Sequence, residues 1–414
     1  MSRMTLLLAC AALAALVSIP AASARPAAGT TVTVDPGITA KTILLGGTSP
    51  LSGPASAYAS VARGADAYFK YANARGGVNG RTIQYKYLDD AYNPAQSVQV
   101  TKQLVEQDKV FAIFNSLGTE QNDAVRPYLN QIKVPQLFVA SGATTFGRDF
   151  KQYPYTIGFQ PSYEAEGWIY GKYLSRTKPG ARIAVLFQND DYGKDLLNGL
   201  KKGIARSKVK VIAAEGYEVT STDVQSQIAK LKASGANTLA LFATPKFAIQ
   251  SYVFANRLGW RPLIVNNAVS SASNIMELAS EGNTNKAVEN SISIVFLKDP
   301  TDLKWRNDAG IKLYRTVLAK YAKGANARDV FHVYGMAAAY ETVKVLKAAG
   351  KNPTRAAVVA QMRKLSDASN PFLLPGIAIK TSATERFPIE QALLQRYTKG
   401  SWKSFGGLWG YRAG

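Results

Sequence analysis

The chain has 414 residues, of which 47% are hydrophobic and 19% are charged, so it is long enough for two globular domains of ordinary size. Its formal net charge is +22, a value that raises the local concentration of anions. The lysines are scattered, and no zinc-finger, RNA-binding-sheet or helix-turn-helix signature accompanies them. We therefore interpret the charge as a basic solvated surface and expect no nucleic-acid partner.

The N-terminus is a predicted signal peptide, residues 1–24. Arg3 supplies its positive end, residues 6–17 form a short apolar segment, and a small-x-small cleavage pattern ends at Ala24. The apolar segment is too short to span a bilayer, and no later apolar run of about 18 residues follows it. We therefore exclude these residues from the fold and expect an exported, soluble protein.

The only cysteine, Cys10, lies inside this signal peptide. The residues before it faintly resemble a lipid-attachment signal, but Leu8 is large for that signal and the apolar run before Cys10 is very short. We therefore expect no lipid anchor. Cleavage after Ala24 would also remove the thiol, which excludes disulfides and thiolate metal sites from the mature chain.

Strands and helices alternate in the first half of the chain, after a loose leader at residues 25–40. Strands are predicted at 42–46, 82–88, 110–114 and 137–140, and helices at 56–74, 95–107 and 122–132. This alternation is typical of βαβ units and predicts a parallel sheet. Residues 153–163 interrupt the rhythm, and we interpret them as a crossing to a second lobe.

The second half repeats the same pattern. Strands are predicted at 183–187, 209–215, 238–242, 263–265 and 291–296, and helices at 164–175, 193–205, 224–233, 248–258, 273–279, 309–321, 330–349 and 355–364. Residues 372–410 are expected to hold a third crossing and a closing β segment. The predicted fold class is α/β, with two Rossmann-like lobes that have parallel-sheet cores and are joined by three hinge crossings. Lobe I would comprise residues 41–157 plus 298–372, and lobe II residues 158–297 plus 373–414.

Catalytic chemistry has little support in the sequence. The sole histidine, His332, stands in an apolar, helix-like run, where a packed residue is more usual than a base. With His332 interpreted as packed, and without a second histidine or a mature cysteine, classical triads and the usual zinc sites are unavailable. Serine–lysine and two-carboxylate schemes stay open, although no motif marks one. We therefore expect no catalytic residues, no metal and no cofactor.

The loop after the predicted strand at 137–140 is the main candidate site. It reads Ser141-Gly142-Ala143-Thr144-Thr145, and a parallel strand delivers such a loop to the crevice where α/β folds bind ligands. Small side chains let a ligand approach the backbone N–H groups, and hydroxyls add further donors. We predict that this loop holds the anionic end of a small molecule, while a strand with an ordinary polar turn remains the simpler interpretation.

Loops of similar chemistry follow the other predicted strands. They contribute Ser49, Ser52, Tyr58, residues 115–119, residues 189–193, Thr244, Asn266 and Asn267. If two sheet edges face each other, these loops form a cleft of hydroxyls, amides and tyrosines. Each charge-assisted bond to a carboxylate would contribute about 1.5–3 kcal/mol, so three suffice for micromolar binding. For any single loop, an ordinary turn or helix cap is the better interpretation, but together the loops favour a cleft.

Several motifs stand in register along the chain. They are Pro-Leu-Ser-Gly-Pro at 50–54 with Tyr58, Asn-Ala-Arg-Gly-Gly-Val-Asn-Gly-Arg at 73–81, Asp89-Asp90 with Pro94, Val134-Pro135, and Tyr192-Gly193. In these motifs the chain resembles the substrate-binding proteins of branched-chain amino-acid-type ABC transporters, the leucine-binding kind with the type I periplasmic binding fold. The resemblance covers essentially the whole mature chain. It implies a periplasmic protein, which we expect to be a monomer, whose lobes close on a small-molecule ligand and deliver it to an ABC-transporter membrane permease.

The resemblance also implies which residues bind the ligand. The loop with Ser116, Leu117, Gly118 and Thr119, and the loop with Ala143, Thr144 and Thr145, would hold the ligand carboxylate. Either Thr144 or Thr145 matches the family threonine, and the chemistry of the second loop adds Ser141 to the predicted set. Tyr58 would line the side-chain pocket, and Tyr192 would close over the ligand from the second lobe. Thr244 and Asn267 complete the predicted binding set.

Two departures from the family pattern bear on the ligand. A disulfide of some members is absent, with Tyr92 near one of its positions. Members that bind amino acids also place an acid after the strand matching 263–265, whereas residues 266–269 here read Asn-Asn-Ala-Val. Because a buried ammonium without a counter-charge costs several kcal/mol, we hypothesise a carboxylate ligand without an α-amino group, such as an aromatic or branched organic acid.

Three alternatives to this hypothesis stay open. Asp190 or Asp191 would supply the missing charge if the ligand is a branched-chain or other amino acid, although either residue also suits capping of the helix near Gly193. An exported hydrolase, or a ligand-sensing module, would use the same cleft for another purpose.

Overall fold

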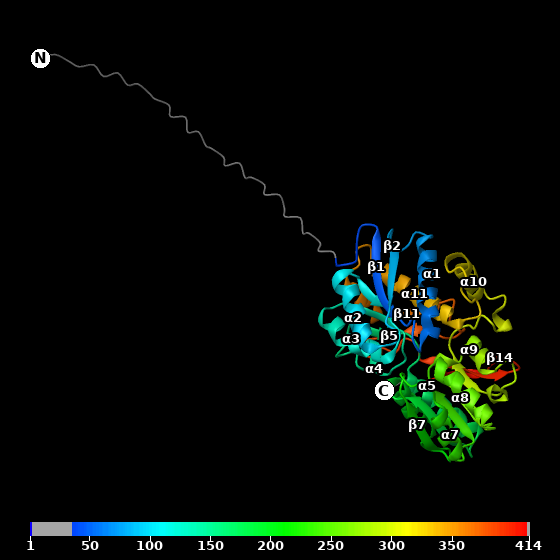
Figure 1. Cartoon of the computed structure of the whole chain (residues 1–414). Coiled ribbons are helices and arrows are strands. Elements are labelled where there is room, and N and C mark those ends of the chain that lie inside the picture. The colour runs from blue at the N-terminus through cyan, green and yellow to red at the C-terminus, as the bar shows by residue number, and fades with distance from the viewer. Residues whose placement is uncertain (2–34, 412–414) are drawn as a thin grey trace. The chain divides into compact units, whose positions relative to one another are not determined.

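The computed structural model describes Met1 and residues 35–411 of the chain (Figure 1). The rest of the predicted signal peptide, and residues 25–34 of the predicted leader, lie outside the described residues. The described part is an α/β protein with two large sheets, ordered β2-β1-β3-β4-β5 and β14-β13-β10-β9-β8-β6-β7. The predicted α/β fold class is confirmed.

The five-stranded sheet is parallel throughout. Its strands are β1 (Thr42–Ser49), β2 (Thr82–Asp89), β3 (Ala112–Phe114), β4 (Gln136–Val139) and β5 (Thr156–Gly158). The helices in this part of the chain are α1 (Ala59–Asn73), α2 (Pro94–Lys102), α3 (Thr119–Gln131) and α4 (Thr145–Arg148). Helices α10 (Ala309–Tyr321), α11 (Val330–Ala348) and α12 (Arg355–Met362) follow much later, and α1 packs on both α10 and α11. We call this sheet with these helices the first lobe.

The seven-stranded sheet is parallel from β10 to β7 and ends in an antiparallel hairpin. Its strands are β6 (Arg182–Gln188), β7 (Lys210–Tyr217), β8 (Thr238–Phe242), β9 (Leu263–Asn266), β10 (Ile292–Val295), β13 (Gln391–Thr398) and β14 (Ser401–Gly410). Helices α5 (Tyr163–Thr177), α6 (Asp191–Ile204), α7 (Gln225–Ala233), α8 (Pro245–Arg257) and α9 (Ser273–Ala279) accompany it. We call this sheet with these helices the second lobe. The hairpin β13–β14 is the predicted closing β segment.

The chain passes between the two lobes three times, as predicted. The passages follow β5, β10 and β12 (Ile379–Lys380), the last of which pairs with β11 (Ser366–Asp367). Two local predictions need correction. The helix predicted at 95–107 is α-helical only to Lys102 and continues as a π-helix over Gln103–Gln107. Helix α3 begins at Thr119, three residues before the predicted start at 122, which brings its N-terminus to the sheet edge.

None of the helices within residues 35–411 combines the length and the apolar character that crossing a membrane requires.

Glycines allow the backbones of helices α1 and α11 in the first lobe to pack directly against each other. A Cβ atom on Gly335 of α11 would overlap the carbonyl oxygen of Val61 on α1, and a Cβ on Gly64 would overlap the carbonyl oxygen of His332. These two glycines therefore fix how closely α1 and α11 approach.

Replacing Gly335 by alanine is expected to lower the free energy of unfolding by about 1–3 kcal/mol, because the added methyl group forces α1 and α11 apart. The matched control is Gly180→Ala, where the new Cβ meets no atom within 4 Å and a change within about 0.5 kcal/mol is expected. Urea unfolding of both variants measures the difference. Equal stability of the two would contradict this account of the α1–α11 contact.

A buried carboxyl group on α11 should make stability depend on pH. Glu341 is 2% exposed, and burial first, then the neighbouring Asp367 carboxylate, raises its pKa to about 8. Lys344 Nζ lies 2.7 Å from Asp367 Oδ1 and pairs with that acid. The folded chain therefore holds a proton on Glu341 that the unfolded chain, with a pKa of about 4.3, releases. This contribution to stability is complete below the unfolded pKa and is lost as the pH rises through 8.

The Glu341→Gln variant should lack this pH dependence. Its unfolding free energy relative to the natural chain is expected to rise by more than about 1.4 kcal/mol, the equivalent of one pKa unit, between pH 5 and pH 9. Denaturant unfolding across this pH range measures the effect. Glu277→Gln is the control, because that side chain is 67% exposed. Parallel curves for Glu341→Gln and the natural chain would show that Glu341 titrates normally.

Candidate functional site

A pocket lies where the two lobes meet. Its lining comprises Tyr58, Val61, Tyr92, Leu117, Gly118, Ala140, Gln160, Tyr163, Tyr192, Thr244, Val269, Phe331 and Tyr334. Its cavity volume is ≈ 50 Å³. Six of the lining side chains are aromatic, and none is ionisable at neutral pH. Such a lining, apolar with a few polar groups, is typical of small-molecule sites.

Five of the predicted binding residues line this pocket: Tyr58, Leu117, Gly118, Tyr192 and Thr244. The other seven, Ser116, Thr119, Ser141, Ala143, Thr144, Thr145 and Asn267, lie outside this lining. Sequence reasoning missed the aromatic wall made by Tyr92, Tyr163, Phe331 and Tyr334. Tyr92 had a signal, since it follows the Asp89-Asp90 motif at the end of β2, but the two α11 residues had none in their local sequence.

Tyr192 enters the pocket from the first turn of α6. Asp190 caps this helix by accepting a hydrogen bond from Gly193 N at 3.1 Å. The Tyr192 ring is 2% exposed and lies 4.8 Å, centre to centre, from the ring of Tyr163. The Asn267 amide oxygen accepts the Tyr192 hydroxyl at 2.6 Å, when its NH₂ group donates to the carbonyl oxygens of Leu241 and Ala243. Asn267 thus holds the Tyr192 hydroxyl in place.

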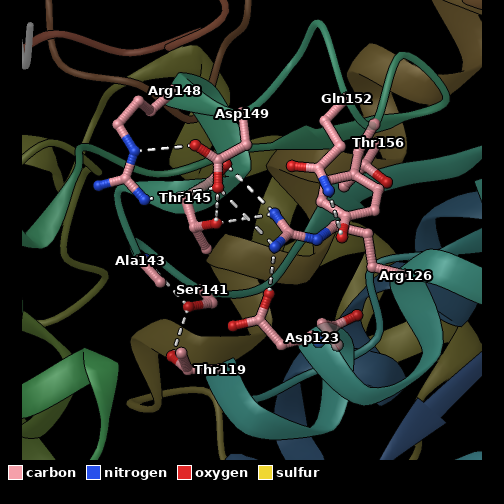
Figure 2. Close-up of polar contacts among 12 residues, drawn as sticks. Thr119, Asp123, Arg126, Ser141, Ala143, Thr145, Arg148, Asp149, Gln152 and Thr156 are labelled. Atoms are coloured by element: carbon pink, nitrogen blue, oxygen red, sulfur yellow. Dashed lines mark hydrogen bonds and ion pairs between the residues drawn. The ribbon is translucent and has the colours of Figure 1, made fainter.

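The loop after β4 is tied into the protein by its own polar groups, as Figure 2 shows. Ser141 Oγ lies 2.7 Å from Thr119 Oγ1 and accepts a bond from Ala143 N at 3.1 Å. Thr145 Oγ1 accepts a bond from Arg126 Nη1 at 2.9 Å and donates to Asp149 at 2.5 Å. These hydroxyls have protein partners, so their contact with a ligand carboxylate stays a prediction that would require exchange of those bonds.

Two further groups of the predicted set bond to neighbouring segments. Ser116 Oγ accepts a hydrogen bond from Thr48 N at 2.9 Å, which joins the loop after β3 to β1. Thr144 N donates to Asp195 Oδ2 on α6 at 2.7 Å. A second bond between the lobes runs from Tyr58 Oη to the carbonyl oxygen of Val269, at 3.0 Å. Both bonds link the first lobe to the second.

Two helix N-termini reach the pocket, one from each lobe. Helix α3 begins after Gly118, whose φ of +110° suits glycine, and no side chain caps it. Helix α8 begins after Thr244, again without a side-chain cap. Both Gly118 and Thr244 line the pocket. Gly118 N and Thr244 N donate to the Ala140 carbonyl oxygen at 3.2 Å and to Tyr217 Oη at 2.9 Å, and Pro245 at the start of α8 has no N–H. The partial positive charge of the two helix N-termini therefore favours an anionic group on the ligand, without a free N–H at Gly118 or Thr244.

Acidic side chains near the pocket are engaged elsewhere. Besides capping α6, Asp190 accepts a bond from Gln188 Nε2 at 2.6 Å, and Asp191 is exposed. Burial raises the pKa of Glu166 to about 7. The Glu166 carboxylate accepts bonds from Tyr170 Oη and Ala268 N, both at 2.6 Å, and so supports the 266–269 segment without lining the pocket. A ligand ammonium would find no carboxylate in the lining.

The described residues contain no group of three or more His, Cys, Asp or Glu side chains that could hold a metal ion. His332 is 2% exposed, and burial lowers its pKa. It lies outside the pocket lining, next to Phe331 in sequence. The prediction that it is a packed residue is confirmed.

Comparison with known proteins gives curated relatives that match about half of the chain and solved structures that match nearly all of it. A Leu/Ile/Val-binding protein homolog 2 from Brucella abortus (strain 2308) is 30% identical over 201 residues, which are 48% of this chain and 53% of that protein. The chain therefore matches about half the length of this curated relative.

Two solved structures match nearly the whole fold. A fatty acid ABC transporter substrate-binding protein from Thermomonospora curvata gives a TM-score of 0.79 at 20% identity, over 91% of this chain and 95% of that chain. A branched chain amino acid ABC transporter from Thermus thermophilus, with bound valine, gives 0.78 at 19% identity, over 90% and 96%. The shared fold is the predicted type I periplasmic binding fold. A family model described as periplasmic binding protein also matches residues 42–401. By this match over most of its length, the chain belongs to the periplasmic binding protein family.

Proposed function

We propose that this chain is an exported solute-binding protein that captures a small carboxylic acid without an α-amino group and delivers it to an ABC permease. The observation that carries the proposal is the pocket lining, which is aromatic, uncharged, and bordered by two helix N-termini. We place the ligand carboxylate at Gly118 and Thr244, where those helices begin. The apolar body of the acid would lie against Tyr58, Phe331 and Tyr334.

The energetics of this arrangement suit an acid better than a zwitterion. Bonds from helix N–H groups to a carboxylate are charge-assisted and contribute about 1.5–3 kcal/mol each. An aromatic or branched body adds roughly 25 cal/mol for each Å² of apolar surface removed from water. An α-ammonium group would gain no ionic partner from the lining and would lose its hydration.

Amino-acid binding is the second candidate, and the comparisons supply the reason to keep it. The Brucella relative is named a Leu/Ile/Val-binding protein homolog, and the Thermus structure holds valine. The Thermomonospora structure is named for fatty acids, so the fold itself accommodates acids without an amino group. Within this chain, Asp190 would have to give up its bonds to Gly193 N and Gln188 to reach an ammonium.

A melting assay with a small library separates these candidates. The library holds benzoate, 3-phenylpropanoate, 4-methylpentanoate, phenylalanine and leucine. A ligand present at 100 times its dissociation constant adds about 2.7 kcal/mol to stability, so a binder raises the melting temperature visibly. The proposal expects shifts from the acids only. Shifts from leucine or phenylalanine alone would replace it with the amino-acid candidate.

The remaining parts of the proposal concern the whole protein. We propose that residues 41–157 plus 298–372 and residues 158–297 plus 373–414 move as two bodies, that the protein acts as a monomer in the periplasm, and that it releases its ligand unchanged. Mass spectrometry of a bound acid after prolonged incubation tests the last point. Recovery of a converted product would favour the hydrolase alternative, and failure to bind any permease would favour the sensing module.

A further inference from the structure

A second concave site lies in the first lobe, on residues that the pocket does not use. It is a groove formed by the end of α12, the β11–β12 pair and the segment after β12. All of its lining side chains that carry charge are basic: Arg363, Lys364, Lys380 and Arg386. The first three are exposed, and the groove, with a volume of ≈ 760 Å³, is broadly open to solvent.

Arg386 sets this groove apart from a solvated basic surface. Three basic side chains of residues 35–411 are 8% exposed: Arg126, Lys298 and Arg386. Arg126 pairs with Asp123 at 2.9 Å, and Lys298 pairs with Asp308 at 2.9 Å. Within the same residues, no carboxylate oxygen lies within 4.0 Å of the Arg386 guanidinium. A nearly buried cation without a paired anion is costly and calls for an explanation.

The neighbours of Arg386 orient it without neutralising it. Its Nη1 atom donates to the carbonyl oxygens of Arg363, at 3.2 Å, and Ser382. The guanidinium carbon lies 5.1 Å from the centre of the Phe150 ring. Burial first, and then the charge of Arg363, lowers the pKa of Arg386, while the Glu385 carboxylate acts in the opposite direction. The groove therefore keeps an excess of positive charge at its floor and its rim.

We propose that this groove binds a small oxyanion with two or more negative charges, such as phosphate or a tricarboxylate. Arg386 would supply charge-assisted donors at the floor, and Arg363 and Lys380 would approach the anion from the rim. The hydroxyl groups of Ser366 and Ser382 add neutral donors to the same lining. The basic side chains of the groove repel one another. A single negative charge would offset little of this repulsion, so the ligand needs more than one.

Calorimetric titration of the full mature protein with phosphate, and separately with citrate, tests the proposal at about 0.15 M salt. One saturable site is expected, with an affinity that falls as the salt concentration rises. The double variant Arg363→Gln/Lys380→Gln should weaken binding at least about tenfold. It changes exposed side chains only, so it should fold even if Arg386→Gln does not. The matched control, Lys208→Gln/Lys210→Gln, removes two exposed charges at and just before the start of β7 and should change binding less than twofold.

Two results would overturn the proposal: the absence of saturable binding for both anions, or equal weakening in the control variant, which would show a diffuse charge effect. A rise in melting temperature with phosphate that is lost in the Arg363→Gln/Lys380→Gln variant would support it independently. Because the groove shares no lining residue with the pocket, binding of an organic acid in the pocket should be unchanged in that variant. Failure of this site and failure of the proposed transport function are thus separate outcomes.

Discussion

Replacing Tyr192 by alanine is expected to weaken binding of 3-phenylpropanoate by about 30-fold or more. The ring belongs to the second lobe, is 2% exposed and packs edge-on against Tyr163. Truncating a buried aromatic side chain at the centre of a binding site typically costs 2 kcal/mol or more, and each 1.4 kcal/mol corresponds to tenfold in affinity. Titration calorimetry on the variant measures the loss.

Tyr192→Phe is the matched control for this prediction. It keeps the ring and removes only the hydroxyl that Asn267 accepts at 2.6 Å, so a loss of up to about tenfold is expected. If alanine and phenylalanine weaken binding equally, the hydroxyl bond rather than the ring carries the effect. If neither changes binding, the acid does not occupy the pocket that Tyr192 lines.

Replacing Arg126 by alanine is expected to lower the free energy of unfolding by about 3 kcal/mol. Its guanidinium pairs with Asp123 at 2.9 Å, donates to Thr145 and lies 4.1 Å from the centre of the Tyr153 ring. Breaking a buried ion pair costs about 3–5 kcal/mol, because it leaves an uncompensated charge. We take the lower end of this range, since the Asp123 and Asp149 side chains are 27% and 25% exposed.

The pH dependence of the Arg126→Ala variant gives this prediction a second test. Burial raises the pKa of Asp123 to about 6, although Arg126 acts to lower it. Without the arginine, that pKa should rise further, and a protonated Asp123 needs no counter-charge. The loss of stability should therefore be largest above neutral pH and shrink as the pH falls through 6.

Arg148→Ala is the control. Arg148 also pairs with Asp149, but its side chain is 59% exposed. Exposed pairs contribute about 0–1 kcal/mol, so denaturant unfolding should barely distinguish this variant from the natural chain. Equal losses for the two arginines would mean that burial of Arg126 does not set its importance.

Local sequence pattern was enough to predict the layered α/β fold. The helices predicted at 273–279 and 309–321 have the bounds of α9 and α10, because apolar spacing and Ser, Thr, Asp or Asn near helix starts are local signals. An Asn-Gly pair is likewise a local turn signal, and Asn79 and Gly80 both have positive φ between Val78 and Arg81, which form an isolated β-bridge. Such features depend on neighbours in sequence and are therefore visible there.

The pocket was predicted only in part, because most of its wall depends on distant segments. Phe331 and Tyr334 come from α11, far along the chain from Tyr58, whose ring lies 5.1 Å from that of Phe331. The strand before the predicted carboxylate loop also carries an irregularity, with Phe138 at a φ of +52° and a register shift against β5. A bulge of this kind turns the side chains that follow it, and simple strand alternation does not predict that turn.

The short helix α4 was missed for a related reason. Residues 141–145 carry turn-forming residues, and the sequence alone favours a polar loop there. In the structure Thr144 N bonds to Asp195 of the second lobe, and Thr145 bonds to Arg126 and Asp149. Asp195 and Arg126 come from α6 and α3, two other segments of the chain, whereas Asp149 directly follows α4. The loop chemistry was therefore predicted, while its distant partners were not.

Calorimetry with phenylalanine and 3-phenylpropanoate tests the central claim most directly, because the two molecules share a carboxylate and an aromatic body and differ by the α-ammonium group. The uncharged aromatic lining predicts saturable binding of 3-phenylpropanoate and at least about tenfold weaker binding of phenylalanine. Tighter binding of phenylalanine would contradict the claim, since it would require a counter-charge that the pocket lining does not contain.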